Sequence, residues 1–584
     1  MNETYIKLQK RNIKKDGLVI LLFLTFSFLM TKNGIQSGKI VTGTDWLFHV
    51  SRVEQIYQNL KQGSFFTFIA TDVFNQSGVG TFLFYPDVFL YPWAFFRFLL
   101  NPINSFYAWY FLLTFLSFII SYFAMKEFSN DNLVMAVSFS FLYVCNNYRL
   151  FVGTAVFGEF IASTFLPLCF LGFYELFFRN EKKWYLLSIG LSLLIYSHVL
   201  SVVISIQLFI FILLIGIICG KFYDFLKRWK ELVKAIILTI VLTGFIIFPF
   251  VSDYIGKNIH APYNSINLDL TPTFSTLLLN SLDNKPYQSV GLFIIIVLLV
   301  GWYFVKNNFT YKCIYGLGIL CLIISTKLFP WSDVKLPFLK VIQLPYRYLD
   351  FSNLFLAIVG SLIISRIFNS LNIITAKKYV MGIIAIATVF FIAFRGNYLN
   401  NPDWYPSQTK EIKSVMLLKK ISNRNIIFPA STLIDKNNYQ YVFNYRCPIG
   451  DTDYYTEKSF KHQKTILSQI TYVNNKGEYI KPIAAPNKFI FNTNLNKRSD
   501  IDFPVIAYSN TRVKLDGIKK NYTLSKRGTP LLKNINPGKH SFVIEYIPNK
   551  TFYLCVISAI AGWILILIKS LYNMYNSRKE HKND

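Results

Sequence analysis

Residues 17–30 read GLVILLFLTFSFLM, and five basic residues precede them: Lys7, Lys10, Arg11, Lys14 and Lys15. Basic residues before an apolar run are typical of a membrane span whose N-terminal end stays in the cytoplasm. No small-residue cleavage site follows this run, which favours a retained span over a removed signal peptide.

The same apolar character recurs along the 584-residue chain, in which 53% of the residues are hydrophobic and 18% are aromatic. A run of about 20 apolar residues can cross the hydrocarbon core of a bilayer. The sequence therefore predicts a polytopic α-helical membrane protein with about twelve spans. After the first, these spans are expected near residues 106–124, 132–149, 161–178, 184–198, 199–219, 231–252, 289–305, 313–329, 350–367, 379–395 and 552–571.

Short basic loops between these runs predict the orientation of the chain, because loops rich in Lys and Arg stay in the cytoplasm. We expect both termini on that side, together with the loops at 126–131, 179–183, 221–230, 306–312 and 369–378. Both ends of the remaining apolar stretch, residues 83–100, must then face outside. We expect that stretch to lie at the interface or to re-enter, without crossing.

The chain divides into three regions by composition: a transmembrane domain at 1–395 with its first outer loop at 31–105, a polar region at 396–551, and a terminal span with a basic cytoplasmic tail at 552–584. The polar region contains the hairpin signals Asp516-Gly517 and Asn536-Pro537-Gly538 between short alternating runs. It is predicted to be an extracytoplasmic domain resembling a β-sandwich.

Charge and motifs narrow the class of function. The net charge of +29 suits anionic lipid and phosphorylated partners, and no basic-aromatic module for nucleic acid is present. The middles of the spans carry almost no charge, whereas ion-coupled transporters need ionisable groups there. The sequence has no Walker A or Rossmann pattern, and its six histidines lack zinc-site spacing. Chemistry at the outer surface is favoured over transport.

The stretch Gly43-x-Asp45-x-x-x-His49-x-x-Arg52 follows the first span. Positions i, i+4 and i+7 fall on one face of a helix. The opposite face carries apolar residues: Val50, Val53, Tyr57 and Leu60. We expect this helix to lie apolar side down on the membrane surface, with its polar face toward a cleft. The alternative is that Thr44 or Asp45 caps a surface helix.

Other polar residues are expected at outer loops and outer helix ends. His198, in Tyr196-Ser197-His198, is either a polar turn residue or a ligand of a phosphate or acceptor. Arg149 and Glu159 flank a short outer loop, 151–158, and could pair with each other. Arg347 is either a snorkelling anchor or a bidentate phosphate clamp.

Two further features lie in the polar region. Asp451-Thr452-Asp453 has the metal-binding DxD pattern of nucleotide-sugar transferases. It lies far from any nucleotide-binding βαβ pattern, and we leave it outside the predicted site. Cys447 is the lone cysteine of this region, so no disulfide is expected within it.

Five motifs, in this order, resemble bacterial YfhO-type membrane proteins: the Asp45–Arg52 stretch, Phe84-Tyr85-Pro86-Asp87, Gly158-Glu159 with Phe165-Leu166-Pro167, Tyr196-Ser197-His198, and Gln343-Leu344-Pro345-Tyr346-Arg347. These proteins belong to the GT-C superfamily of lipid-linked sugar transferases, and some relatives are labelled "6-pyruvoyl-tetrahydropterin synthase-related". The resemblance covers most of the first 400 residues. The lack of a zinc-histidine pattern gives the synthase activity no support.

The resemblance implies a catalytic Asp in the first outer loop, a polyprenyl-phosphate-linked sugar as donor, and an acceptor outside the membrane. Asp45 matches that carboxylate as general base, and Asp87 is the best candidate for a second acidic group, with Asp72 next. Candidate substrate-binding residues are His49, Arg52, Arg149, Glu159, His198 and Arg347. The chain lacks the WWDxG motif and the paired acidic dipeptide of oligosaccharyltransferases. A divalent cation, Mg²⁺ or Mn²⁺, therefore stays open as a cofactor.

The resulting hypothesis is a glycosyltransferase of the cell membrane that modifies a cell-envelope polymer or glycolipid by an inverting displacement, with Asp45 as base. Two alternatives remain. One is a non-catalytic envelope assembly or interaction protein that acts through its basic β-rich region. The other is a translocase or polymerase of lipid-linked glycans.

Overall fold

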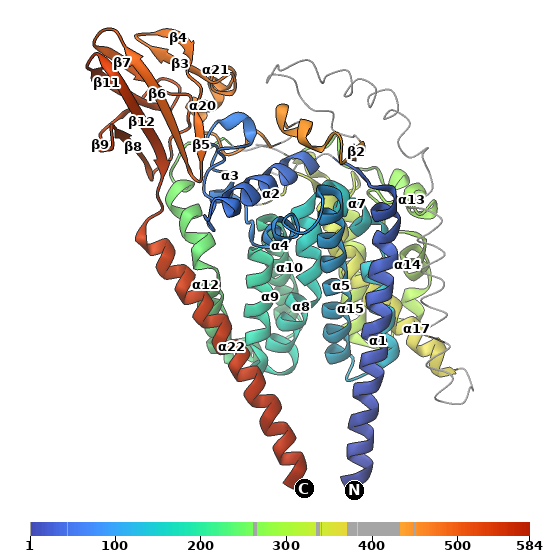
Figure 1. Ribbon diagram of the computed structural model, residues 1–584. Coiled ribbons are helices and arrows are strands. Elements are labelled where there is room, and N and C mark those ends of the chain that lie inside the picture. The colour runs from blue at the N-terminus through green and yellow to red at the C-terminus, as the bar shows by residue number, and fades with distance from the viewer. Residues whose placement is uncertain are drawn as a thin grey trace.

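The molecule is a bundle of long helices with a β-rich part at one end and both chain termini at the other (Figure 1). The computed structural model describes residues 2–43, 45–260, 266–333, 339, 341–370, 382, 433–447 and 450–583. We call the end that carries the β-rich part the β end, and the opposite end, near the termini, the basic end.

The apolar runs of the sequence form helices at the expected places. Seven helices among the described residues are long and apolar enough to cross a membrane, and α6, α14 and α15 are shorter apolar helices. The bundle helices are α1 (Asn2–Ser37), α5 (Pro102–Phe128), α6 (Leu133–Val144), α8 (Phe157–Tyr174), α9 (Tyr185–Ile195), α10 (Val199–Ile218), α12 (Trp229–Asp253), α14 (Leu292–Val305), α15 (Phe309–Ile324), α17 (Tyr348–Ser370) and α22 (Lys550–Asn583). The predicted span at 379–395 lies outside the described residues.

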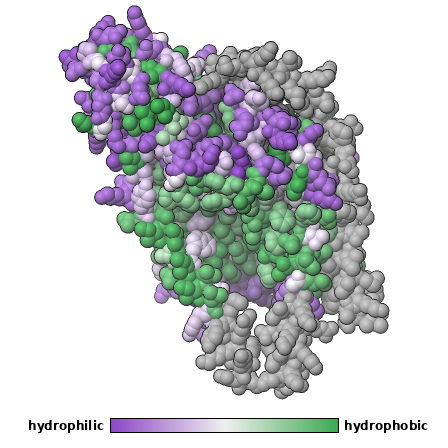
Figure 2. Space-filling view, in the orientation of Figure 1, coloured by the Kyte–Doolittle hydropathy of each residue, from purple (hydrophilic) through white to green (hydrophobic). Residues whose placement is uncertain are grey.

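The bundle carries an apolar band beneath a polar β end (Figure 2). Large aliphatic side chains on α10, α12 and α22 are exposed, including Ile210, Ile237 and Leu565. Exposed aliphatic surface of this extent suits contact with lipid tails. The predicted class, a polytopic helical protein with a β-rich domain before its last span, is confirmed.

The basic loops lie together at the basic end, where ion pairs join them. Lys126 pairs with Asp16 at 2.7 Å and Arg228 with Glu181 at 3.2 Å. Buried Glu175 pairs with Arg179 at 3.0 Å. These ion pairs join the first span to the loop at 126–131, and the loop at 179–183 to the loop at 221–230.

The first outer loop forms a layer of short helices over the bundle at the β end. It contains α2 (Trp46–Lys61), α3 (Thr81–Phe84), η2 (Val88–Leu90) and α4 (Tyr91–Phe96). Residues 83–100 thus form short helices and turns that do not cross, as predicted.

The expectation that α2 lies apolar side down on a membrane surface is wrong, whereas Asp45 and His49 do face a cavity, as expected. Both faces are buried: His49 and Arg52 on one, Val50 and Val53 on the other. The reason is that a distant part of the chain, residues 439–447 and 450–456, packs over α2. We call this segment the cover, and its Cys447 Sγ lies 4.0 Å from Ser51 Oγ. The capping alternative also fails for Asp45, whose side chain makes no cap hydrogen bond.

The β-rich part is built from two five-stranded antiparallel sheets, with strand orders β10-β11-β7-β3-β4 and β5-β6-β12-β8-β9. The strands are β3 (Ile470–Val473), β4 (Lys476–Tyr479), β5 (Ile483–Ala485), β6 (Lys488–Leu495), β7 (Ser499–Asp502), β8 (Thr511–Leu515), β9 (Ile518–Lys520), β10 (Thr523–Leu524), β11 (Pro530–Ile535) and β12 (Gly538–Tyr546). The predicted hairpin at Asp516-Gly517 joins the paired strands β8 and β9, and both residues have positive φ, as a tight hairpin requires. The hairpin predicted at Asn536-Pro537-Gly538 is wrong, because this turn joins β11 to β12, which belong to different sheets.

Several contacts fix the β-rich part on the bundle. Strand β1 (Lys39–Val41), just after α1, pairs with β2 (Leu433–Asp435). At the end of α12, the Asp253 carboxylate accepts hydrogen bonds from Ser509 N at 2.9 Å and from Tyr546 Oη at 3.1 Å. These contacts hold the β-rich part in a defined position against the bundle.

Candidate functional site

A cavity of about 400 Å³ lies between the first outer loop, the β ends of the bundle helices and the cover. We call it the charged cavity. Four residues predicted from sequence line it, and they come from three separate segments: Asp45 and His49 at the start of α2, His198 before α10, and Arg347 before α17. Asp453, from the β-rich side, lines it as well.

The backbone before α2 holds Asp45 against helix α7 (Asn147–Ala155). Asp45 N donates to the carbonyl of Ala155 at 3.1 Å, and Gly43 N donates to that of Thr154 at 2.9 Å. A Cβ on Gly43 would lie 2.6 Å from Ala155 Cα, so only glycine permits this approach. The position of Asp45 is thus set by main-chain contacts.

Two buried histidines line the charged cavity. The His49 ring packs against Tyr85 and Phe157, each at 5.4 Å between ring centroids. His198 Nδ1 lies 2.9 Å from Ser201 Oγ at the start of α10. Burial lowers the pKa of both imidazoles well below the usual value, and nearby guanidinium groups, Arg52 for His49 and Arg347 for His198, lower it further. Both rings are therefore neutral near pH 7 and can form hydrogen bonds.

Arg347 ends the short helix η6 (Pro345–Arg347) at the entrance to α17 and is only 7% exposed. Its Nη1 donates to the carbonyl of Ile342 at 2.6 Å. Its Nε lies 3.9 Å from Glu159 Oε2, and Tyr148 Oη donates to the other Glu159 oxygen at 2.7 Å. A buried guanidinium in this setting suits a phosphate group.

Three other candidates lie outside this lining. Arg52 donates to the carbonyls of Tyr85 at 2.7 Å and Pro86 at 2.8 Å. Arg149 donates to the carbonyl of Phe160 at 3.0 Å on α8. Asp72 accepts from Gln55 Nε2 at 2.9 Å. Each of these side chains fixes the protein's own groups, and their substrate-binding roles stay predictions.

A second cavity, the aromatic groove, runs between the first outer loop, α12 and α22 and holds about 520 Å³. Its lining is almost entirely apolar and includes Phe245, Phe552 and Trp563. Asp87 lines it as well, and burial raises the pKa of that carboxyl to about 6, against the opposing effect of Arg52. The charged cavity and the aromatic groove share one wall: Phe84, Tyr85 and Pro86.

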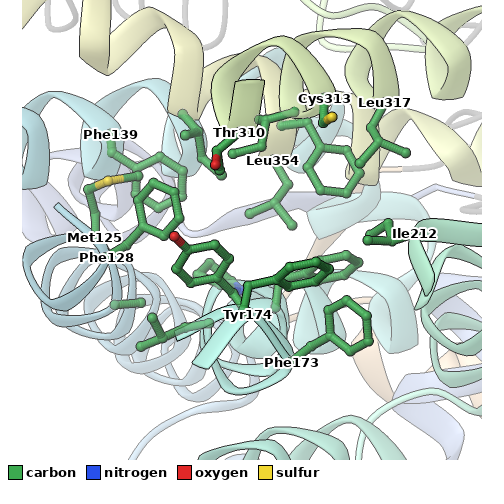
Figure 3. A pocket seen from close by; sticks show the side chains of 18 of the residues that line it. Met125, Phe128, Phe139, Phe173, Tyr174, Ile212, Thr310, Cys313, Leu317 and Leu354 are labelled. Atoms are coloured by element: carbon green, nitrogen blue, oxygen red, sulfur yellow. The ribbon is translucent and has the colours of Figure 1, made fainter. Parts of the chain in front are cut away.

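A third pocket, of about 170 Å³, lies inside the bundle among α5, α6, α8, α10, α15 and α17. Its lining is aromatic and aliphatic (Figure 3). The side-chain oxygens in view belong to Tyr174 and Thr310, and the sulfur atoms belong to Met125 and Cys313. No charged side chain lines this pocket, so it offers no acid, base or phosphate ligand.

Among the described residues, no three His, Cys, Asp or Glu side chains group closely enough to hold a metal ion. The carboxylates that line the charged cavity are Asp45 and Asp453. Proteins commonly bind Mg²⁺ through one or two carboxylates, together with waters and substrate phosphates. The divalent cation therefore stays an open expectation, and we derive no step through a metal.

Asp453 is the site residue that the sequence interpretation excluded. In the DxD motif, Asp451 Oδ2 pairs with Arg446 Nε at 2.7 Å, whereas Asp453 lines the charged cavity. The motif itself was the available signal. Its place in the site depends on the fold of residues 450–455 over α2, which local sequence does not specify.

The family model described as "6-pyruvoyl-tetrahydropterin synthase related domain; membrane protein" matches residues 82–399. The chain belongs to this family. The family predicted from the motifs is thus confirmed, and this member of the family is a membrane protein. No curated protein sequence matches it. It is similar to the crystal structure of ArnT from Cupriavidus metallidurans bound to undecaprenyl phosphate, with a TM-score of 0.40, 10% identity, and coverage of 73% of this chain and 85% of that one. A likeness at this score establishes no function.

Proposed function

We propose that this family member is a membrane glycosyltransferase that moves a sugar from a polyprenyl-phosphate donor to a cell-envelope acceptor on the side of the β-rich part. One observation carries the proposal: the charged cavity and the aromatic groove meet at a single wall. A lipid-linked sugar has a charged head and an apolar tail joined at a phosphate, and it needs two such compartments side by side.

The donor would lie across the shared wall. Its phosphate would face Arg347, with neutral His49 and His198 as hydrogen-bonding groups on the same cavity. Its first isoprene units would pass Phe84, Tyr85 and Pro86 into the aromatic groove. That groove is lined in part by α22, which also carries exposed apolar residues suited to contact with lipid tails.

The reaction is a single displacement at the anomeric carbon. A bond forms from the acceptor oxygen to that carbon, and the bond from the carbon to the phosphate oxygen breaks, with the electron pair leaving on phosphate. The acceptor proton passes to the Asp45 carboxylate as general base. Arg347 stabilises the negative charge that develops on the phosphate. No covalent intermediate is needed.

The test is complementation of a deletion strain. Envelope glycans of the parent and the deletion strain are compared by mass spectrometry, and the strain is then supplied with the wild-type gene or the Asp45→Asn gene. We expect one sugar modification to disappear on deletion and to return only with the wild type. Return of that modification with Asp45→Asn would instead favour a non-catalytic assembly protein.

A further inference from the structure

Asp453 reaches the charged cavity from the side opposite the bundle. The segment that carries it pairs with the chain that follows α12, through an isolated bridge between Ile259 and Thr456. Tyr454 N donates to the carbonyl of His260 at 3.2 Å, and Tyr508 Oη donates to the carbonyl of Tyr454 at 2.8 Å. The main chain on the C-terminal side of Asp453 is thus fixed to both the bundle and the β-rich part.

The cover also shows a conformation that costs energy. Tyr454 has φ +67°, which is unusual for a residue with a Cβ. Gly450 has φ +94°, and a Cβ there would lie 2.5 Å from the Phe48 ring on α2. Strained backbone that the surroundings hold in place is common at functional sites. Here it fixes the direction of the one residue of the segment whose carboxylate lines the cavity.

The two carboxylates of the DxD motif have different surroundings. Asp451 is paired with Arg446, so that guanidinium is occupied. Asp453 has no hydrogen-bond partner or ion pair within the described part of the chain. Two buried polar atoms nearby also lack a hydrogen-bond partner there: His49 Nδ1 and Arg347 Nε. The cavity therefore presents unused donors and acceptors to a ligand.

We propose that Asp453 is a second catalytic carboxyl, which in its protonated form donates a hydrogen bond to the acceptor while Asp45 takes the acceptor's proton. The inference rests on the proposed sugar transfer and assigns the acceptor side of the site. The basic groups of the cavity lie on the bundle, where the donor phosphate would bind, and Asp453 lies on the cover.

The electrostatics agree with this division. Burial, followed by the negative charges of Asp45 and Asp451, raises the pKa of Asp453 to about 7. Two carboxylates in a poorly solvated site do not readily ionise together. The other titratable or charged groups on this cavity and segment are His49, Tyr85, His198, Tyr254, Tyr287, Tyr346, Arg347, Arg446, Cys447 and Tyr454.

Most of these groups keep one charge state near neutral pH. Burial lowers the pKa of His49 and His198 well below the usual value and raises that of Cys447 and Tyr454 well above it. Burial also raises the pKa of Asp87 to about 6, but this carboxyl lines the neighbouring aromatic groove. Glu159, which pairs with Arg347 behind the lining, is a further buried carboxyl. A loss of the proton near pH 7 that depends on Asp453 therefore distinguishes the Asp45–Asp453 pair from these two groups.

The test compares wild type with Asp453→Asn and Asp453→Ala in purified, detergent-solubilised full chain. Asn keeps a hydrogen-bond donor that cannot ionise, whereas Ala removes it. The wild-type rate should fall as pH rises from about 6 to about 8, and Asp453→Asn should remove that fall. Asp453→Ala should raise the acceptor KM about tenfold, the loss of roughly one hydrogen bond. Identical pH profiles for wild type and Asp453→Asn would overturn the proposal.

A readout without substrate separates this inference from the proposed function. Infrared difference spectra should show the C=O stretch of a protonated carboxyl that disappears near pH 7 in wild type and is missing in Asp453→Asn. An unchanged band in the variant would overturn the assignment of the proton. If the band behaves as expected and wild type transfers no sugar, the proposed function and the acceptor role fail together, whereas the proton on Asp453 stands.

Discussion

Nε of Arg347 lies 3.9 Å from Oε2 of Glu159, an ion-pair distance beyond hydrogen-bond length. Tyr148 donates to the other oxygen of Glu159, and Arg347 Nη1 donates to a main-chain carbonyl. Arg347 Nε has no hydrogen-bond partner among the described residues. The guanidinium is thus oriented by the protein while part of its binding capacity remains for an anion.

Arg347→Ala should weaken donor binding more than acceptor use. Loss of the buried guanidinium that binds the phosphate should raise the apparent donor KM roughly 10- to 100-fold. Arg347→Lys should restore only part of the donor affinity, because an ammonium group cannot form the bidentate contact. Steady-state kinetics with each substrate varied in turn measures this. The control is Arg366→Ala, which removes a guanidinium from the other end of α17, away from the charged cavity. An unchanged donor KM would show that Arg347 is only an anchor.

Asp45→Asn should lower the transfer rate by about 10²- to 10⁴-fold, the usual contribution of a general base. Membrane abundance should not change, because main-chain contacts set the position of residue 45 and Asn has the same size as Asp. Quantitative immunoblotting and a transfer assay measure the two effects. The matched control is Asp283→Asn, an exposed carboxylate near the same end. Full activity in Asp45→Asn would reject the base assignment.

Sequence periodicity was sufficient for much of the fold. Apolar runs located the helices, and the i, i+4 spacing put Asp45 and His49 on one face. The charge of the loops placed His198 and Arg347 on the same side of the membrane as Asp45 and His49. Residues at the same ends of packed helices lie close together, so the four were expected near one another. Local patterns carry this information.

The parts that sequence missed depend on contacts between distant segments. The second face of α2 is covered by residues 439–447 and 450–455, almost 400 positions away. No local pattern on α2 could therefore distinguish a membrane surface from a protein cover. The sequence predicted Arg52 as a substrate-binding residue, but in the structure its guanidinium donates hydrogen bonds to the carbonyls of Tyr85 and Pro86. Asp453 joins the site only through the same cover.

Arg52→Met should lower the thermal midpoint of the protein. The change leaves the carbonyls of Tyr85 and Pro86 without their guanidinium donor, and an unpaired buried polar group costs about 1–3 kcal/mol. The shared wall should loosen, which would also weaken donor binding. Scanning fluorimetry in detergent measures the midpoint, and Lys61→Met at the exposed end of the same helix is the control. Equal midpoints would mean that Arg52 does not hold the wall.

Ala559→Trp should narrow the aromatic groove and discriminate against long donors. Ala559 is 3% exposed and lines the groove from α22, whereas Ile557 is 63% exposed on the same helix. We expect the donor KM to rise at least about tenfold for a long-chain polyprenyl donor and little for a short-chain analogue, since only the long tail needs the filled volume. Ile557→Trp should leave both unchanged. Equal effects on both chain lengths would place the tail elsewhere.

Labelling of single cysteines tests which end of the bundle faces outward. Native Cys447 is buried, so it should stay silent to a membrane-impermeant thiol reagent, whereas an Asn437→Cys variant places a thiol at an exposed position near the β end. Native Cys219 is exposed near the basic end and serves as the internal control. In intact cells we expect labelling at position 437 and none at Cys219, and both should react once the cells are broken. The reverse pattern would invert the orientation, and an acceptor outside the membrane would then have no access to the charged cavity.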